Sequence, residues 1–502
     1  MSAHRFSART VIGGLTALAV LLVLAGCTLE PRYHRPSLPT AAQWPIPPNT
    51  LPSQAPAGTP AAVLNQLPVS SPNAGSVGGS QRAVDIGWRD FFADAQLQRI
   101  IATALANNRD LRVAVLNIQQ SHEQYVIQRG NSFPQLNADG SWTKEQLSAA
   151  QVGFPLKTSY FSATAALSSF ELDLFGRVRS ENHAALQQYF AQVEARRATQ
   201  LSLIAQVVQQ YLTLIADRQL LRLAQDTLQS QQSSYGITVK EHDSGQVSGL
   251  DVAQAESTVE SARSDVARYE GNIAQDVDEL DLLAGATVDT SQVPDVLDNK
   301  VFGIAALPAE LPSDVLLRRP DVLEAEHTLL ANNADIGAAR AAFFPAIDLT
   351  GSAGYISSNL SSLVEPASAS WSATPSITAP IFHGGQLIGA LGEARVNRDI
   401  AVAQYEKAIQ TAFREVADAL ALTTTLEHQV EAQLALVHAT GEAYSLSQQR
   451  YKAGRDSYLD VLDSQRSFYT AQQSLIAAQL SQQTNRTTLF KALGGGWRET
   501  SQ

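Results

Sequence analysis

The stretch Gly454-Arg455-Asp456-Ser457-Tyr458-Leu459-Asp460-Val461 has an equivalent 209 residues earlier, where Gly245 precedes Leu250-Asp251-Val252. Each stretch follows a long run without proline, from residue 177 to 240 and from 386 to 453. Glycine after a long helical pattern is typical of a left-handed turn that ends a helix. Each stretch is therefore expected to join two long helices.

Further anchors recur in the same order at offsets of 209 to 211 residues, which indicates a tandem duplication. The alternative is two generic coiled-coil segments that share turn glycines. We expect a first repeat at 87-295 and a second at 296-502. The anchors are Asn108-Arg109-Asp110-Leu111 with Arg319-Pro320-Asp321-Val322, Phe133-Pro134 with Phe344-Pro345, and Phe175-Gly176 with Gly384-Gly385.

Each repeat follows the same order of elements. A helix of about 30 residues comes first (residues 94–129 and 313–342), followed by two alternating stretches, a very long helix, the glycine turn and a second long helix. Apolar residues in the long helices step by three and four, which is the spacing of a coiled-coil seam. At 1.5 Å per residue each long helix would run on the order of 100 Å. The seams are Leu201, Ile204, Val208, Leu212 and Ile215, and Tyr405, Ile409, Phe413, Val416 and Leu420.

The alternating stretches predict four strands with an apolar face and a small polar face, near residues 136–143, 161–168, 347–355 and 371–379. This pattern fits membrane strands that face lipid on one side and water on the other. The alternative is a pair of surface hairpins on a soluble body. The residues expected on the lipid-facing outer face are Trp142, Phe161, Leu349, Tyr355 and Trp371.

Four strands cannot close a membrane barrel, because roughly eight is the practical minimum and open edges are not tolerated in hydrocarbon. Several subunits must therefore contribute four strands each. Two subunits would give a barrel filled by side chains, and three would give one with room for a channel. The residues alone leave both possibilities open.

The N-terminus has the layout of a secretory signal: basic residues at 4–9, a short apolar stretch at 11–24, and then Ala25-Gly26-Cys27. This site resembles a bacterial lipobox, so 1-26 is expected to be a lipoprotein signal peptide and Cys27, the only cysteine, to carry N-acyl and S-diacylglycerol lipid (palmitate). The alternative is an ordinary signal peptide with a chance cysteine. Residues 27-86 are then a lipid-anchored, Pro-rich, extended segment.

Composition excludes several classes. The formal net charge is −12, which argues against nucleic acid as a partner, because nucleic-acid binding needs a basic face. The nine histidines contain no pair at metal-ligand spacing, and His122-Glu123 lacks the second histidine of a zincin. We expect no enzyme activity, no catalytic residue, no metal and no cofactor.

The whole mature chain resembles the TolC/OprM family of outer-membrane efflux channels, in its NodT-type lipoprotein branch. The matching runs are Cys27-Thr28-Leu29-Glu30-Pro31, Trp88-Arg89-Asp90-Phe91-Phe92-Ala93-Asp94, Leu317-Arg318-Arg319-Pro320-Asp321-Val322, Ala339-Arg340-Ala341-Ala342-Phe343-Phe344-Pro345, Tyr451-Lys452-Ala453-Gly454 and Leu459-Asp460-Val461-Leu462-Asp463.

The resemblance implies a mainly α fold with a membrane β-barrel portion: a homotrimer whose subunits share a twelve-stranded outer-membrane β-barrel and a periplasmic α-barrel of long coiled-coil helices. It implies an exit duct for drugs or other small molecules in a tripartite efflux pump, partnered by a periplasmic adaptor (membrane fusion) protein, an inner-membrane pump and outer-membrane lipid. The resemblance also implies a location in the outer membrane of a Gram-negative bacterium, lipid-anchored and with a large periplasmic part. Alternatives are the outer-membrane component of a type I protein secretion system, or a lipid-anchored periplasmic coiled-coil adaptor.

The glycine turns are the expected functional tips. The resemblance implies a periplasmic gate made by Asp460 and Asp463, with Tyr451 and its partner Asp251 tying neighbouring coils shut. The alternative for Asp460 is a carboxylate that complements a helix dipole. The turns themselves are expected to meet the adaptor through Gly245, Ser248, Gly454 and Ser457.

Overall fold

The computed structural model describes residues 28–41, 44, 86–148, 150, 153–154, 156–298, 301–303, 313–496 and 498–500. The predicted leader 1-26, the acylation site Cys27 and the Pro-rich stretch 45–80 lie outside these residues. The chain divides into two compact units, each described by itself below: Met1–Ser37 with Val115–Ala195 and Leu323–Ala408, and Leu38–Ala114 with Arg196–Val322 and Ile409–Gln502.

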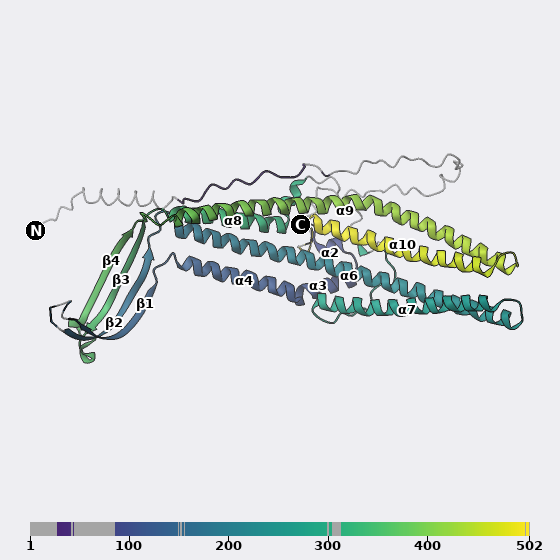
Figure 1. Ribbon diagram of the computed structural model, residues 1–502, viewed down its shortest axis with the longest axis horizontal. Helices are drawn as coiled ribbons and strands as arrows, with labels where there is room; N and C mark the ends of the chain where they lie inside the picture. Colours follow the sequence, from purple (N-terminus) through teal and green to yellow (C-terminus); the bar gives the residue numbers. More distant parts are fainter. Residues whose placement is uncertain are drawn as a thin grey trace, which may run out of the picture. The chain divides into compact units, whose positions relative to one another are not determined.

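Long helices and one sheet dominate the chain (Figure 1). The helices are α2 (Trp88–Phe91), α3 (Ala95–Asn107), α4 (Arg109–Gly130), α6 (Arg177–Asp243), α7 (Gly249–Ala284), α8 (Pro320–Ala341), α9 (Gln386–Lys452) and α10 (Tyr458–Ala492). The strands are β1 (Leu136–Leu147), β2 (Leu156–Glu171), β3 (Ala346–Ser357) and β4 (Ala369–Thr378), with short 3₁₀ turns η3 (Ser313–Arg318), η4 (Leu360–Ser362) and η5 (Pro366–Ser368).

The two longest helices, α6 and α9, have 67 residues each, which is on the order of 100 Å at 1.5 Å per residue. They begin at Arg177 and Gln386, as the proline-free runs predict. None of the helices in the described ranges combines the length and the hydropathy that a membrane-spanning helix requires.

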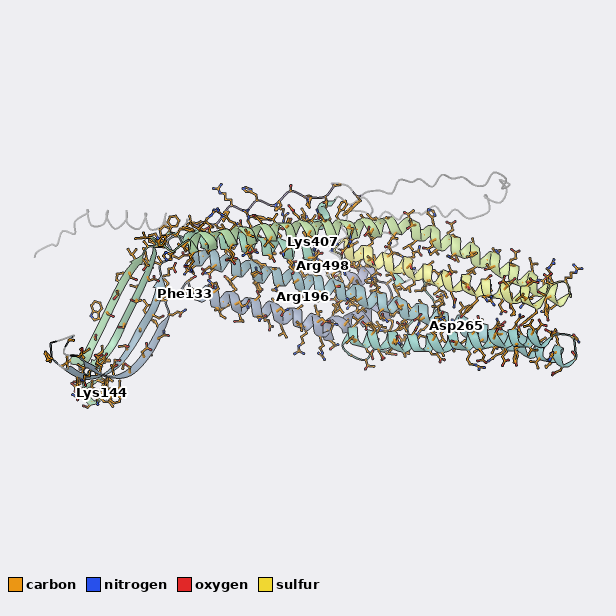
Figure 2. All side chains as sticks on the ribbon, in the orientation of Figure 1. Phe133, Lys144, Arg196, Asp265, Lys407 and Arg498 are labelled. Carbon is orange, nitrogen blue, oxygen red and sulfur yellow. The ribbon has the colours of Figure 1, made fainter. Side chains whose placement is uncertain are left out.

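The strands form one antiparallel sheet in the order β1-β2-β3-β4. Figure 2 labels Phe133, just before β1, at the helix end of the sheet, and Lys144 of β1 at the opposite end. Paired residues of an antiparallel sheet point to the same face. The registers Trp142↔Phe161, Ala163↔Tyr355 and Ala353↔Trp371 therefore confirm that the predicted apolar set shares a face, and Leu349 joins it by the two-residue period of β3.

Serine side chains bridge the strands on the other face of the sheet. Ser141 and Ser162 lie 2.8 Å apart (Oγ to Oγ), and Ser352 and Ser372 lie 2.9 Å apart. Alternation between the two faces thus follows the sequence pattern.

In the unit that contains the sheet, the segment Thr28–Ser37, called the strap below, lies along α6 and α8. The Arg35 guanidinium donates to both carboxylate oxygens of Glu326, at 2.8 and 2.5 Å. Tyr33 Oη also donates to Glu326, at 3.0 Å, and the carboxylate of Glu30 lies 3.0 Å from Nδ1 of His183. Several polar contacts therefore hold the segment that follows the predicted acylation site.

Aromatic side chains form the core of the other unit. Trp88, Phe91 and Phe92 are buried in one cluster with Phe302 and Phe490, and the rings of Phe91 and Phe490 stack with centroids 3.9 Å apart. Burying side chains of this kind contributes roughly 1.5–3 kcal/mol each. The Trp-Arg-Asp-Phe-Phe run thus connects the start of the first repeat to the end of the second.

The structure corrects the first helix of each repeat. The predicted single helix 94–129 is two helices, because Asn108 is extended (ψ 134°) and ends α3. Its side chain accepts a bond from the amide of Leu111 at 2.9 Å and so starts α4. In the second repeat the prediction 313–342 becomes η3 followed by α8, which begins at Pro320, where a missing N–H costs nothing.

Candidate functional site

The two glycine turns have the same backbone geometry. Gly245 (φ +76°) donates to the carbonyl of His242 at 2.8 Å, and Gln246 donates to that of Glu241 at 2.8 Å. Gly454 (φ +66°) and Arg455 repeat these bonds to Tyr451 and Arg450, at 2.8 and 2.9 Å. This is the Schellman motif, and only glycine enters the left-handed region without steric cost.

A capping box starts the helix after each turn. Ser248 Oγ accepts from the amide of Asp251, whose carboxylate accepts from the amide of Ser248 at 2.9 Å. Ser457 and Asp460 form the same pair, at 3.1 Å. Asp251 and Asp460 therefore cap helices. Both also lie in the first turn of their helix, where a carboxylate complements the helix dipole, as the alternative for Asp460 expects.

Of the two gate aspartates predicted on α10, only Asp460 belongs to a capping box. Asp460 and Asp463 are both exposed, and Asp463 has no hydrogen-bond or ion-pair partner among the described residues. The three-residue spacing places both carboxyl groups on one side of α10. A pair of exposed carboxylates thus stands next to the second turn.

Tyr451 ties one helical hairpin to the other. Its hydroxyl donates to Glu241 Oε2 at 3.3 Å within the chain. The expected pairing of Tyr451 with Asp251 between neighbouring coils stays a prediction. Burial and then the negative charge of Glu241 raise the pKa of Tyr451 to about 12. The hydroxyl therefore stays protonated, as a donor, at neutral pH.

The second turn is closed by an ion pair. Arg450 donates through Nε and Nη2 to the two carboxylate oxygens of Asp456, at 2.6 and 2.8 Å. The hydrogen bond from Arg450 and its charge lower the pKa of Asp456. Arg450 aligns with Glu241 at the 209-residue offset of the repeat. The sequence analysis did not name either residue, although their alignment beside the two turn glycines marks both positions.

Tyrosines pack between the hairpins at the same level. Tyr458, with Val461, Leu462 and Ala255, forms a small buried cluster against which Tyr235, Tyr444 and Tyr451 pack. The rings of Tyr451 and Tyr458 lie 5.4 Å apart. The contact between hairpins is thus part apolar and part hydrogen bond.

A second polar bridge joins α7 to α10 farther from the turns. Tyr469 Oη donates to Asp265 at 3.0 Å, and Gln473 Nε2 donates to Tyr269 Oη at 3.1 Å. Figure 2 labels Asp265 on α7. Burial, with the hydrogen bond to Asp265 next, raises the pKa of Tyr469. No local sequence pattern predicts this bridge, because its residues are 204 positions apart.

No arrangement of three or more His, Cys, Asp or Glu side chains in the described ranges could hold a metal ion. The turns offer capped helices, exposed carboxylates and one hydrogen bond between hairpins. These groups suit contacts with another protein and with cations, and the hydrogen bond between the hairpins can form or break.

Comparison with known proteins decides the family. The family model for outer membrane efflux proteins matches residues 100–286 and 311–495. The chain belongs to the outer membrane efflux protein family. Its two matched ranges correspond to the two predicted repeats, and the predicted resemblance is confirmed.

Individual relatives of this efflux protein agree with the family match. It is 44% identical over 488 residues to the toluene efflux pump outer membrane protein TtgC of Pseudomonas putida, covering 97% of this chain and 96% of that one. It is 38% identical to the cation efflux system protein CusC of Escherichia coli, covering 97% and 99%. The solved open state of the Neisseria gonorrhoeae MtrE outer membrane channel matches with a TM-score of 0.81 and 36% identity, covering 95% and 100%.

The efflux protein is therefore an outer-membrane exit channel of the tripartite-pump type, as predicted, and its long helices with a four-stranded sheet have the fold of the solved channels. The family is one of channels. The lipid-facing role of the apolar sheet face, the gate and the docking role of the turns stay predictions.

Proposed function

We propose that three copies of the chain close one channel through the sheet. In the described chain β1 and β4 each pair with one strand only, and an open edge in hydrocarbon leaves backbone groups unsatisfied. Three copies supply twelve strands, with Trp142, Trp371 and the rest of their face toward lipid. Trp142 and Trp371 are 62% and 79% exposed in the single chain, which supports an apolar surface covered by membrane.

The turns form the closed end of the duct. The observation that carries this proposal is the Tyr451–Glu241 bond, which links the α9–α10 hairpin to the α6–α7 hairpin next to the exposed Asp460 and Asp463. With α10 facing the threefold axis, six carboxylates crowd the entrance, attract cations and repel anions. Opening requires the hairpins to part, and therefore the Tyr451 bond to break.

Docking of a periplasmic adaptor supplies the energy for opening. Both turns expose the capping serines, Ser248 and Ser457, on a rigid frame of Schellman bonds. The relatives are named as components of efflux pumps, one of them for toluene; this supports small-molecule efflux over protein secretion. Acylation of Cys27 anchors the chain to the outer membrane, and no cofactor takes part.

Bilayer recordings test the gate. The double variant Asp460→Ala, Asp463→Ala is expected to lose most of its cation selectivity and its block by divalent cations. Asp456→Asn is the matched control, because Asp456 is the acidic residue of the same turn that pairs with Arg450. Wild-type selectivity and block in the double variant would show that these carboxylates do not line the entrance.

Drug susceptibility tests docking. Ser248→Tyr and Ser457→Tyr are expected to impair pump-dependent resistance while the trimer stays intact on a native gel. Ser233→Tyr, on the exposed surface of α6, is the control. Unchanged susceptibility in both turn variants would exclude adaptor docking at the turns.

A further inference from the structure

Two carboxyl groups meet inside the α6–α7 pair, away from the turns. Asp276 of α7 is 8% exposed. Gln210 of α6 donates through Nε2 to Asp276 Oδ1 at 2.7 Å and to the Asp276 carbonyl at 3.3 Å. The amide of Gln210 thus satisfies one carboxylate oxygen and fixes the side chain.

The other oxygen of Asp276 is not satisfied. Oδ2 is buried and has no hydrogen-bond donor among the described residues. Asp217 follows Gln210 by seven residues, two turns along the same face of α6, and its negative charge acts on Asp276. Two ionised carboxylates are acceptors only and repel each other. A proton between them removes the repulsion and supplies the missing donor.

Neighbouring cations do not replace that proton. Arg268 is the cation that acts on Asp217 in the described structure, but its side chain is 57% exposed and bonded to Asp265 at 2.8 Å. Arg218, next to Asp217, donates to the carbonyls of Val293 and Thr290. Asn272 also acts on Asp217 through a side-chain hydrogen bond, but its amide carries no charge.

We propose that Asp217 and Asp276 share one proton and that this proton is a pH-dependent lock between α6 and α7. The lock lies wholly within one α6–α7 pair and uses no residue of the gate or of the adaptor-docking turns. The proposed ligand of the two carboxyl groups is a proton. A divalent cation such as calcium or magnesium also binds carboxylate and amide oxygens, and the experiment below distinguishes the two.

The direction of the pH effect follows from the linkage between protonation and folding. Burial, and then the charge of Asp217, raises the pKa of Asp276 from 3.8 to about 6. The folded state therefore holds a proton that the opened state releases, and the contact weakens as pH rises from about 4 to about 6. Gln210, which bonds Asp276, also lines an open cavity of about 660 Å³ with Gln206, Gln209 and Thr213.

Hydrogen exchange of the full-length trimer in detergent tests the lock. Amides of α6 around 210–220 and of α7 around 269–280 are expected to open about tenfold more often at pH 8 than at pH 5, after correction for the intrinsic exchange rate, given the shift from 3.8 to about 6. Asp276→Asn, which donates to Asp217 at every pH, is expected to lose this dependence. Asp278→Asn, an exposed position on the same helix, is expected to keep it.

Each other outcome overturns the proposal. Equal pH dependence in the wild type and Asp276→Asn means that no proton links the helices. Protection restored at pH 8 by calcium or magnesium chloride in the wild type, and not in Asp276→Asn, means that a cation neutralises the pair instead. If Asp276→Asn fails to assemble, Asp217→Asn, which also leaves a neutral donor in the pair, gives the same readout.

Discussion

Replacing Arg35 by glutamine is expected to loosen the strap and the first turns of α8. Glu326 is 7% exposed, and Arg35 contacts it through two hydrogen bonds. Among the described residues, losing Arg35 leaves that carboxylate with the Tyr33 hydroxyl as its one hydrogen-bond donor. An uncompensated buried charge is strongly unfavourable.

The magnitude follows from the exposure of the two partners. A fully buried pair costs about 3–5 kcal/mol when one partner is removed, and an exposed pair up to about 1 kcal/mol. The Arg35 side chain is 45% exposed and that of Glu326 9%, so we expect a loss of about 2 kcal/mol, between the two limits. At 1.4 kcal/mol per decade this is about 30-fold faster local opening.

Local hydrogen exchange is the appropriate assay, because a trimeric multi-unit protein has no single free energy of unfolding. Peptides covering residues 28–37 and 323–330 are expected to exchange faster in Arg35→Gln. Arg263→Gln, which removes an exposed pair with Glu260, is the control. In Arg35→Leu with Glu326→Leu most of the protection is expected to return, since no charge is left buried. Equal exchange in Arg35→Gln and the control would refute the reasoning.

Three further predictions concern the strap, the second turn and the anchor. The hydrogen bond to Glu30 raises the pKa of His183, so the strap is expected to be held below about pH 6.5 and to exchange faster as pH rises through the folded pKa; Glu30→Gln should abolish this dependence. Gly454→Ala is expected to destabilise the second turn by about 1–2 kcal/mol, because alanine must adopt the left-handed φ of +66°. The measurement is hydrogen exchange of the flanking helix ends, and no change would contradict the strain. Cys27→Ser is expected to lose palmitate labelling, and label retained in the variant would contradict acylation there.

The regular features of the fold could be predicted because each has a local sequence signal. Proline-free runs set the starts of α6 and α9, and alternation placed the four strands and their apolar face. The break at Asn108 was missed because the polar run Asn107-Asn108-Arg109-Asp110 contains no glycine or proline, and asparagine is a weaker stop signal than either. Asn108 aligns with Arg319, which directly precedes Pro320. This alignment indicates a helix start at Arg109, because a helix starts directly after each of the two positions.

The site was only partly predictable. Serine and aspartate at fixed offsets from the turn glycines mark both capping boxes, since a capping box is a local motif. The partner of Tyr451 could not be read from the sequence alone, because Glu241 is 210 residues away and the choice between Glu241 and Asp251 depends on how two hairpins pack. The Asp217–Asp276 contact was missed for the same reason: isolated aspartates in long helices look like solvated surface.

Resting conductance of the reconstituted trimer tests the central claim, a duct held closed by contacts between hairpins. Losing the Tyr451–Glu241 bond is expected to remove about 1 kcal/mol per subunit, or about 3 kcal/mol over three copies if opening is concerted, which raises the open probability about 100-fold. Tyr451→Phe and Glu241→Ala should therefore both conduct at rest, and Tyr235→Phe, whose hydroxyl has no hydrogen-bond partner in the described structure, should stay closed. Resting conductance of Tyr451→Phe and Glu241→Ala equal to that of Tyr235→Phe would contradict the account.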